Sequence, residues 1–203
     1  MMRKIAIAAI IALAVGPALA QTPPAGTPTR IRGAVDKLDG QNLMVKSRDG
    51  QTLTIELAAN VVVITLVKKS IADIKAGDYV ASTGVKGTDG KIHAVEVRIF
   101  PEAARGTGEG QSPWDLTPDS IMTNATVGKI DQAPQGPVLH VTFKGTESEF
   151  TVGPDVPVLA NGPGDISLLK PGVAVFVIAL KHEDGKLTSA RLYAEKDGIK
   201  PPM

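Results

Sequence analysis

Apolar and polar residues alternate along much of this chain. Leu53, Ile55 and Leu57 are separated by Thr and Glu residues, and a period of two is typical of a strand with one buried face. Residues 61–67 are almost continuously apolar, which predicts a strand covered on both sides. Residues 70–75 are expected to form one short helical turn. Together with 21 Gly and 15 Pro, the pattern predicts short β-strands joined by many turns.

Two pairs of predicted strands flank an Asp-Gly dipeptide. Residues 79–85 and 93–100 lie on either side of Asp89-Gly90, and residues 174–181 and 187–194 lie on either side of Asp184-Gly185. Asp and Gly readily adopt the positive φ angles that a tight hairpin turn needs. Each pair is therefore predicted to form a β-hairpin.

Three segments recur in the same order at a spacing of 92 to 95 residues. Residues 33–39 match 125–131, residues 74–77 match 169–172, and residues 89–92 match 184–187. A period this long indicates duplicated domains rather than a solenoid. The Lys-x-Gly element at Gly77 and Gly172 belongs to this repeat, and we expect its glycine to end the short turn and precede the next strand.

The predicted fold class is all-β, with two tandem repeats of a small, five- to six-stranded OB-like barrel after an N-terminal signal peptide. The repeats are assigned to residues 30–100 and 123–195. A barrel is favoured because closure leaves no exposed strand edge. An open sandwich is the alternative.

The first twenty residues have the three parts of a secretory signal. Arg3 and Lys4 precede an apolar run over residues 5–15, and Ala18 and Ala20 place small side chains before Gln21. A bilayer span needs about 20 apolar residues. The run over residues 5–15 is shorter than that, so a cleaved signal is favoured over a membrane anchor. We therefore predict cleavage after Ala20, a periplasmic location and no membrane span in the mature chain.

Three further segments lie outside the predicted barrels. Residues 21–29 are rich in Thr and Pro and are expected to form a flexible lead. Residues 101–122 form a Gly- and Pro-rich linker that is expected to be ordered. Residues 196–203 form a tail that ends near Pro201-Pro202, and we expect it to fray.

Composition narrows the function classes. Only 3% of residues are aromatic, so the cores are expected to consist of Val, Ile, Leu and Ala. Loss of Arg3 and Lys4 would lower the formal net charge from +1 to −1, and no basic excess favours nucleic acid as a partner. The absence of cysteine excludes disulfides, thiol catalysis and cysteine-based zinc sites.

The linker carries the most distinctive motif. It reads Phe-Pro-Glu-Ala-Ala-Arg-Gly-Thr-Gly-Glu-Gly over residues 100–110, Pro-Trp-Asp-Leu over 113–116, and Met-Thr-Asn-Ala-Thr-Val over 122–127. With the flanking repeats, this motif resembles a family of exported bacterial proteins built from a small β-barrel domain of unknown function. Some members are labelled metal transporter permeases, which this sequence contradicts because it lacks multiple membrane spans. Family members often have His-Arg where this chain has Gln111-Ser112, which argues against a histidine ligand in the linker.

Two features of the linker are candidate contacts for a ligand or partner. Glycine amides in its first part could approach an anion beside an arginine, although the Lys and Ser/Thr of a phosphate loop are missing. A hinge between barrels is the favoured alternative. The only tryptophan could anchor a partner or pin the linker between the barrels, and the second interpretation is favoured. The candidate residues are Arg105, Gly106, Gly108, Glu109, Gly110, Trp114 and Asp115.

The histidines do not form a recognisable site. His93 has the parity of a buried strand face, His140 is expected to face solvent, and His182 lies beside a turn. Their spacing does not match a metal-binding motif, and no Gly-x-Ser-x-Gly elbow is present. We therefore predict neither catalysis nor a metal or cofactor.

The sequence favours a non-catalytic envelope binding or interaction module. The alternative is a periplasmic carrier of a small ligand or metal. The partner is correspondingly an unknown envelope protein or a small ligand.

Overall fold

The computed structural model describes residues 26–202. The predicted signal and residues 21–25 of the predicted lead lie outside the described residues. The described chain is all-β, as predicted, and contains no α-helix. Its strands are β1 (Thr27–Asp39), β2 (Asn42–Ser47), β3 (Thr52–Lys69), β4 (Tyr79–Lys86), β5 (Ile92–Ile99), β6 (Gly110–Pro113), β7 (Ser120–Asp131), β8 (Val138–Phe143), β9 (Thr146–Thr151), β10 (Val158–Pro163), β11 (Ala174–Lys181) and β12 (Leu187–Ala194). Three 3-10 turns are η1 (Ile71–Asp73), η2 (Glu102–Ala104) and η3 (Ile166–Leu168).

The first unit is a closed five-stranded barrel. Its strands follow the order β12-β11-β1-β2-β3, and parallel pairing of β12 with β3 closes the ring. The predicted alternation on β3 is confirmed, because Ile55 and Leu57 are buried while Thr54 is exposed. These side chains join an aliphatic core that includes Leu43 and Leu192.

The second unit has the same number of strands. Its order is β5-β4-β7-β8-β9, and a single parallel pair between His93 and Thr151 links β5 to β9. Strand β10 lies beside the other end of β5 in parallel register. The core is again mainly aliphatic and contains Val97, Leu139 and one aromatic residue, Phe150.

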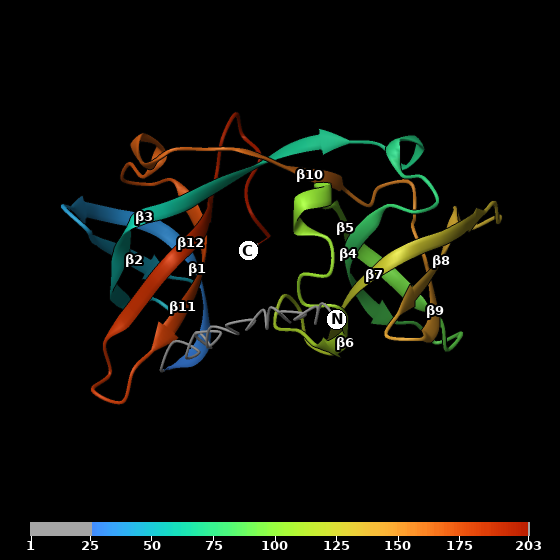
Figure 1. Ribbon diagram of the computed structural model, residues 1–203, viewed down its shortest axis with the longest axis horizontal. Helices are drawn as coiled ribbons and strands as arrows, with labels where there is room; N and C mark the ends of the chain where they lie inside the picture. The colour runs from blue at the N-terminus through green and yellow to red at the C-terminus, as the bar shows by residue number, and fades with distance from the viewer. Residues whose placement is uncertain (1–25, 203) are drawn as a thin grey trace, which may run out of the picture.

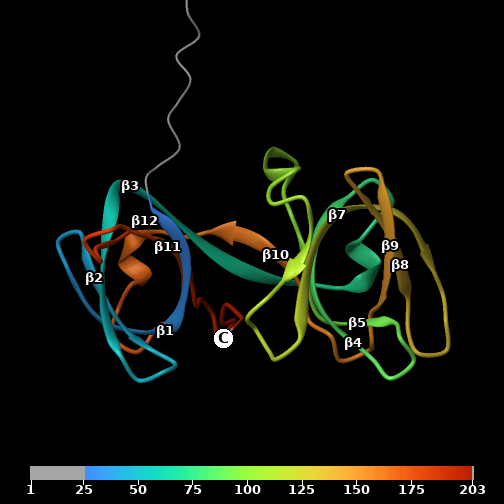
Figure 2. The same cartoon turned by 90° about the horizontal axis from the view of Figure 1, so that it is seen from below.

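The two units exchange strands, which the predicted domain boundaries did not anticipate. Residues 30–100 contribute β1, β2 and β3 to the first barrel but β4 and β5 to the second. Residues 123–195 contribute β7, β8 and β9 to the second barrel but β11 and β12 to the first. Neither stretch therefore closes a barrel alone, and the predicted division at 30–100 and 123–195 does not separate the packing units (Figures 1 and 2).

The length of β3 explains the exchange. Its 18 residues extend over roughly 60 Å at the usual strand rise, which is enough to leave the first barrel and reach the second. The end of β3 pairs with β10 in antiparallel register, from Ile64 with Pro163 to Lys69 with Val158. This two-stranded ribbon bridges the barrels along one side of the molecule (Figure 1).

The bridging position also corrects the expectation for residues 61–67. That stretch is not covered on both sides, since Val62 is 52% exposed and Val67 is 40% exposed. Val63 and Leu66 are buried, and they point to opposite faces of the strand, so each face is covered over only part of its length. Val63 packs in the core of the first barrel and Leu66 in a small apolar cluster with Phe176 and Tyr193, so the cover changes from one face to the other along the ribbon.

The two predicted hairpins and the Lys-x-Gly element form as expected. Strand β4 pairs with β5, and β11 pairs with β12. Gly77 and Gly172 have φ of 92° and 89°, values that a residue with a Cβ rarely adopts. Each glycine donates its amide to the first strand of the other half: Gly77 to Val127 O at 2.7 Å and Gly172 to Val35 O at 2.8 Å. The element therefore fastens each half of the chain to the other.

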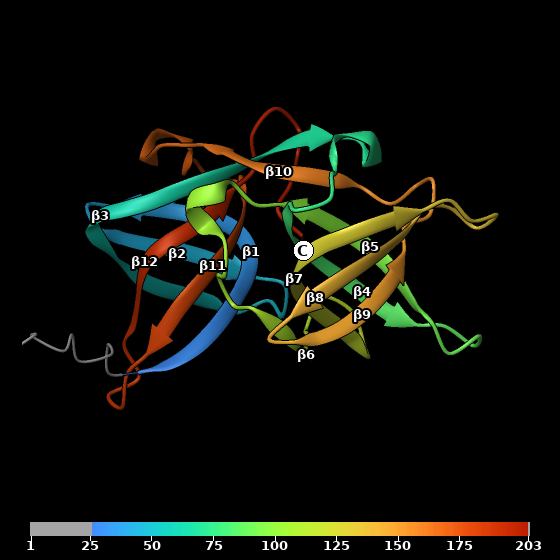
Figure 3. The ribbon, with the colours of Figure 1, turned by 45° about the vertical axis from the view of Figure 1, so that its right-hand side comes forward.

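The end of the described chain is packed, not frayed. Pro201 is buried, and Pro202 O accepts a hydrogen bond from Arg32 Nε at 3.1 Å. Ile199 packs against a small apolar cluster between the barrels. Figure 3 shows the C-terminus lying in this central region. Our expectation for residues 196–202 was therefore wrong, because proline carbonyls and apolar side chains find partners there.

Candidate functional site

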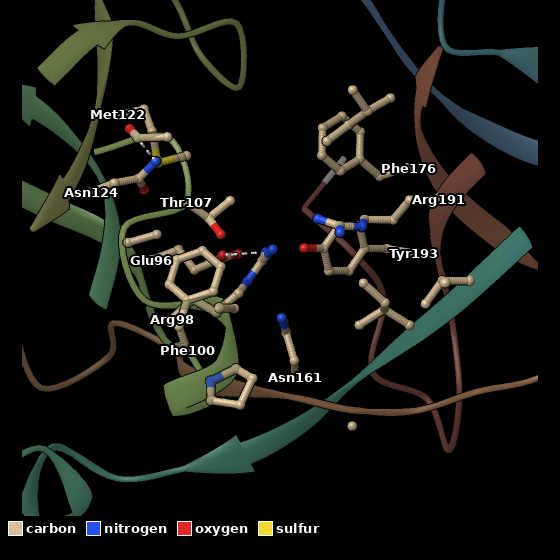
Figure 4. A pocket seen from close by; sticks show the side chains of 18 of the residues that line it. Glu96, Arg98, Phe100, Thr107, Met122, Asn124, Asn161, Phe176, Arg191 and Tyr193 are labelled. Atoms are coloured by element: carbon tan, nitrogen blue, oxygen red, sulfur yellow. Dashed lines mark hydrogen bonds and ion pairs between the residues drawn. The ribbon is translucent and has the colours of Figure 1, made fainter. Parts of the chain in front are cut away.

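A large cavity lies between the two barrels. It has a volume of about 820 Å³, within the range of pockets that hold small organic ligands. Its walls come from β4 and β5 of the second barrel, β11 and β12 of the first, the β3–β10 ribbon and the linker. Figure 4 shows the side chains that enter it. Both halves of the chain are needed to form it.

Aromatic residues are concentrated at this cavity. The chain has one Trp, two Tyr and four Phe, and four of these seven line the cavity: Phe100, Trp114, Phe176 and Tyr193. The Phe176 and Tyr193 rings stack with centroids 5.9 Å apart. The prediction of aliphatic cores is therefore accurate for the barrels, while the few aromatic residues gather where the barrels face each other.

Arginine supplies the positive charge of the lining. Arg30, Arg98 and Arg191 line the cavity, together with one acid, Glu96, and no lysine or histidine. The charged side chains of the lining therefore carry a formal surplus of positive charge. Such a surplus in a concave site favours an anionic ligand.

Arg98 and Glu96 form a buried ion pair in the cavity wall. Each residue is only 8% exposed, and Arg98 Nη2 donates to Glu96 Oε1 at 2.7 Å. Burial raises the pKa of Glu96, and the charge of Arg98 opposes this effect only in part. The Arg98 guanidinium also lies 4.9 Å from the centre of the Tyr193 ring on the opposite barrel.

Three buried polar atoms at the cavity lack a partner. Arg98 Nε, Asn124 Oδ1 and Asn161 Oδ1 make no hydrogen bond with any described residue, and all three residues line the cavity. A buried polar atom without a partner costs about 1–3 kcal/mol. Such atoms are uncommon in folded proteins, and a cavity whose wall carries three of them is suited to a ligand with polar groups.

Trp114 joins the linker to the first barrel. The Arg30 guanidinium lies 4.0 Å from the centre of its ring, and the ring meets Phe176 edge-on at 6.4 Å. Asp115, next in sequence, forms an ion pair with Arg32. Burial lowers the pKa of Arg32, while Asp115 opposes that effect. The favoured interpretation, a tryptophan that pins the linker between the barrels, agrees with these contacts.

The glycine-rich part of the linker is held by internal contacts. Arg105 bonds to Glu102 and, at 2.9 Å, to Gly77 O. Glu109 accepts from Lys144 N at 2.9 Å. Arg105 is therefore turned toward the second barrel and does not lie in the cavity lining.

The glycines of the same segment lie in different environments. Asn124 Nδ2 donates to Gly108 O at 3.0 Å, and Gly108 alone of these glycines lines the cavity. Gly106 is exposed, and Gly110 begins β6. The structure therefore does not bring the three glycines together with Arg105 around a single point.

The three histidines lie away from the cavity and apart from one another. His93 Nε2 contacts Asp89 at 3.0 Å, His140 Nε2 contacts Asp131 at 2.9 Å, and His182 Nε2 contacts Thr188 at 2.9 Å. Within residues 26–202, no group of three potential metal ligands is present.

The expected parity of His93 was wrong. The register of β4 against β5 shifts between Thr83 and Gly84, which leaves Val95 as an extra residue on β5. Ala94 and Val97 consequently face the core, and the His93 side chain is 38% exposed.

Comparisons with known proteins identify no relative of this chain. No family model, curated protein or solved structure matches this chain. In the part of the chain that the structure describes, no helix has the length and hydropathy to cross a membrane.

Proposed function

We propose that this chain is an exported, periplasmic binding protein that holds a small organic ligand in the cavity between its barrels. Its role is to bind rather than to catalyse. The observation that carries the proposal is the combination of a cavity of about 820 Å³ with an aromatic lining and a buried arginine. A ligand-sized cavity with apolar walls and a few convergent polar groups is the usual form of a small-molecule site.

The linker contacts support a ligand carrier over a module that binds partners through the linker. Arg105 and Glu109 already bond within the chain, so they have less capacity for a partner protein. Trp114 is half-buried against Arg30 and Phe176. The cavity, in contrast, presents unpartnered polar atoms at Arg98 and Asn161.

We also propose that the two halves arose by duplication of one OB-like unit. Register shifts occur between Val35 and Lys37 and again between Val127 and Lys129. In both halves the lysine after the shift bonds to the aspartate two residues on, at 3.0 Å in the first and 2.8 Å in the second. Equivalent irregularities at equivalent positions support a common origin better than generic β-structure would.

Binding can be measured with the neutral fluorescent probe N-phenyl-1-naphthylamine. Trp114 is the only tryptophan and lines the cavity, so quenching of its emission by energy transfer reports a probe bound nearby. We expect Ala104→Phe to weaken binding by about tenfold, because the larger ring projects into the lining and overpacking of this kind costs about 1–3 kcal/mol. The measurement is a titration followed at the emission of both fluorophores.

Ala133→Phe is the matched control. Ala133, like Ala104, is half-buried, but it lies in the loop between β7 and β8, outside the cavity lining. We expect its affinity to equal that of the unmodified protein. A probe that does not quench Trp114, or that binds both variants equally, would show that the cavity is not the site.

A further inference from the structure

Arg98 has more donors than its partner uses. A guanidinium has five N–H groups in a planar fork that matches an oxyanion. In the described chain, Arg98 makes one side-chain hydrogen bond, from Nη2 to Glu96, and its Nε has no partner. The residue is 92% buried, since only 8% is exposed. Donors therefore remain on a largely buried side chain at the cavity wall.

Arg191 adds a second positive charge without a compensating acid. It lines the cavity from β12, and it forms no ion pair with the described residues. Arg30, by comparison, lies within 3.7 Å of Asp115 and stacks on Trp114. Figure 4 shows Arg98 and Arg191 extending from opposite sides of the cavity. Two arginines from the two barrels thus carry charge that the protein itself leaves only partly neutralised.

The remaining walls suit a flat apolar body. Phe100, Phe176 and Tyr193 line the cavity, and aromatic rings bind planar apolar groups by stacking and edge contacts. Met122 and Pro163 add aliphatic surface. The lining therefore combines a cationic centre with aromatic and aliphatic sides.

We infer that the ligand is an organic anion, with an apolar, ring-containing body and one carboxylate, sulfonate or phosphate group held by Arg98 and Arg191. This inference rests on the proposed ligand-binding function and specifies the chemistry of its ligand. The anionic group accepts hydrogen bonds from the free guanidinium donors. The body lies against the aromatic walls.

Two fluorescent probes that differ by one sulfonate test the inference. N-phenyl-1-naphthylamine is neutral, and 8-anilinonaphthalene-1-sulfonate has the same skeleton with one negative charge. We expect the sulfonate to bind at least about tenfold more tightly, because it gains charge-assisted hydrogen bonds from the guanidinium groups. Both titrations are followed by energy transfer from Trp114, which gives the strongest signal for probe bound close to the cavity.

Variants locate the preference at the two arginines. Glu96→Gln with Arg98→Met removes both charges of the buried pair and avoids an unpaired buried carboxylate, and it should abolish the preference for the sulfonate. Arg191→Met changes an exposed residue and should reduce the preference several-fold without endangering the fold. Lys69→Met removes the same charge from an exposed site outside the cavity and should leave the preference unchanged.

The outcomes separate this inference from the proposed function. Equal affinity for the two probes, with Trp114 quenched by both, overturns the anionic ligand while the binding role stands. Failure of both probes to quench Trp114 overturns both proposals. An equal loss of preference in Arg191→Met and Lys69→Met overturns the assignment to the arginines, because general charge attraction then explains the result.

Affinity for the sulfonate probe should also rise as the pH falls. The charged groups that act on Glu96 are Arg98 on its own strand and Arg32 on β1, and Arg30 and Arg191 complete the charged lining. Burial already raises the pKa of Glu96, and an anion bound nearby raises it further. Binding therefore takes up protons, which favours the complex at lower pH.

The measurement is a set of titrations between about pH 8 and pH 5, above the ordinary glutamate range. Glu96→Gln removes the titrating group, so its affinity should be higher at neutral pH and nearly independent of pH. A pH dependence that persists in Glu96→Gln would contradict an anion bound beside this carboxylate.

Discussion

Cutting the chain in its linker is expected to leave the two halves associated. A short protease recognition sequence inserted after Gly106 lies in an exposed loop where an added side chain meets no other atom within 4 Å. After cleavage, the first fragment still supplies β4 and β5 to the second barrel, and the second fragment still supplies β11 and β12 to the first. Separation would expose both cores, so the fragments should elute together in native gel filtration.

The same experiment discriminates between exchanged and independent barrels. Denaturing electrophoresis shows that cleavage is complete, and gel filtration in denaturant should then separate the two fragments. Native elution as two species, each of about half the original mass, would contradict the exchange of hairpins.

Removing apolar volume from either core is expected to destabilise the whole molecule. Leu43 on β2 and Leu139 on β8 are both fully buried, and they face Leu38 and Ile130 across equivalent strand pairs. Leu43→Ala and Leu139→Ala should each lower the free energy of unfolding by about 2–5 kcal/mol, through lost transfer energy and the cavity left behind. Because each core contains strands from both halves, we expect a single transition in each variant.

The measurement is urea unfolding followed both by far-UV circular dichroism and by Trp114 fluorescence. Coincident curves that shift together indicate one cooperative unit. Val62→Ala is the control, because Val62 is 52% exposed and its truncation should cost less than about 0.5 kcal/mol. Two separated transitions, of which each leucine variant moves only one, would argue that the barrels unfold independently.

The strands could be predicted because they depend on local pattern. Alternation placed Ile55 and Leu57 in a core, and the Asp-Gly dipeptides located both hairpins. Which barrel each hairpin joins depends instead on how far the preceding strand extends. The sequence does contain a signal for the long β3, since no Gly or Pro interrupts residues 52–69, whereas Gly153-Pro154 falls between β9 and β10. An uninterrupted strand of that length is too long for one side of a small barrel.

The cavity was harder to predict than the strands. Trp114 and Asp115 stood out because their motif is distinctive; Trp114 lines the cavity, and Asp115 forms an ion pair with Arg32. Arg98 and Arg191 belong to no recognisable sequence motif, and they lie on strand faces that are ordinarily exposed to water. Those faces meet only because the hairpins exchange, so the site could not be inferred without the topology. The nearest local signal was Glu96 and Arg98 on the same strand face.

Strand exchange has a consequence for how the two sides of the cavity differ. Leu192 pairs with Val63, and Val97 pairs with Val158, so the two hairpins occupy matching places and Arg98 corresponds to Tyr193. A homodimer of one half-chain would present the same residue from both sides, arginine against arginine or tyrosine against tyrosine. Under the duplication proposed above, fusion into one polypeptide allows the two copies to diverge, and here the guanidinium of Arg98 lies over the ring of Tyr193. Such an asymmetric cavity can orient a molecule that carries a charged group at one end and an apolar body at the other.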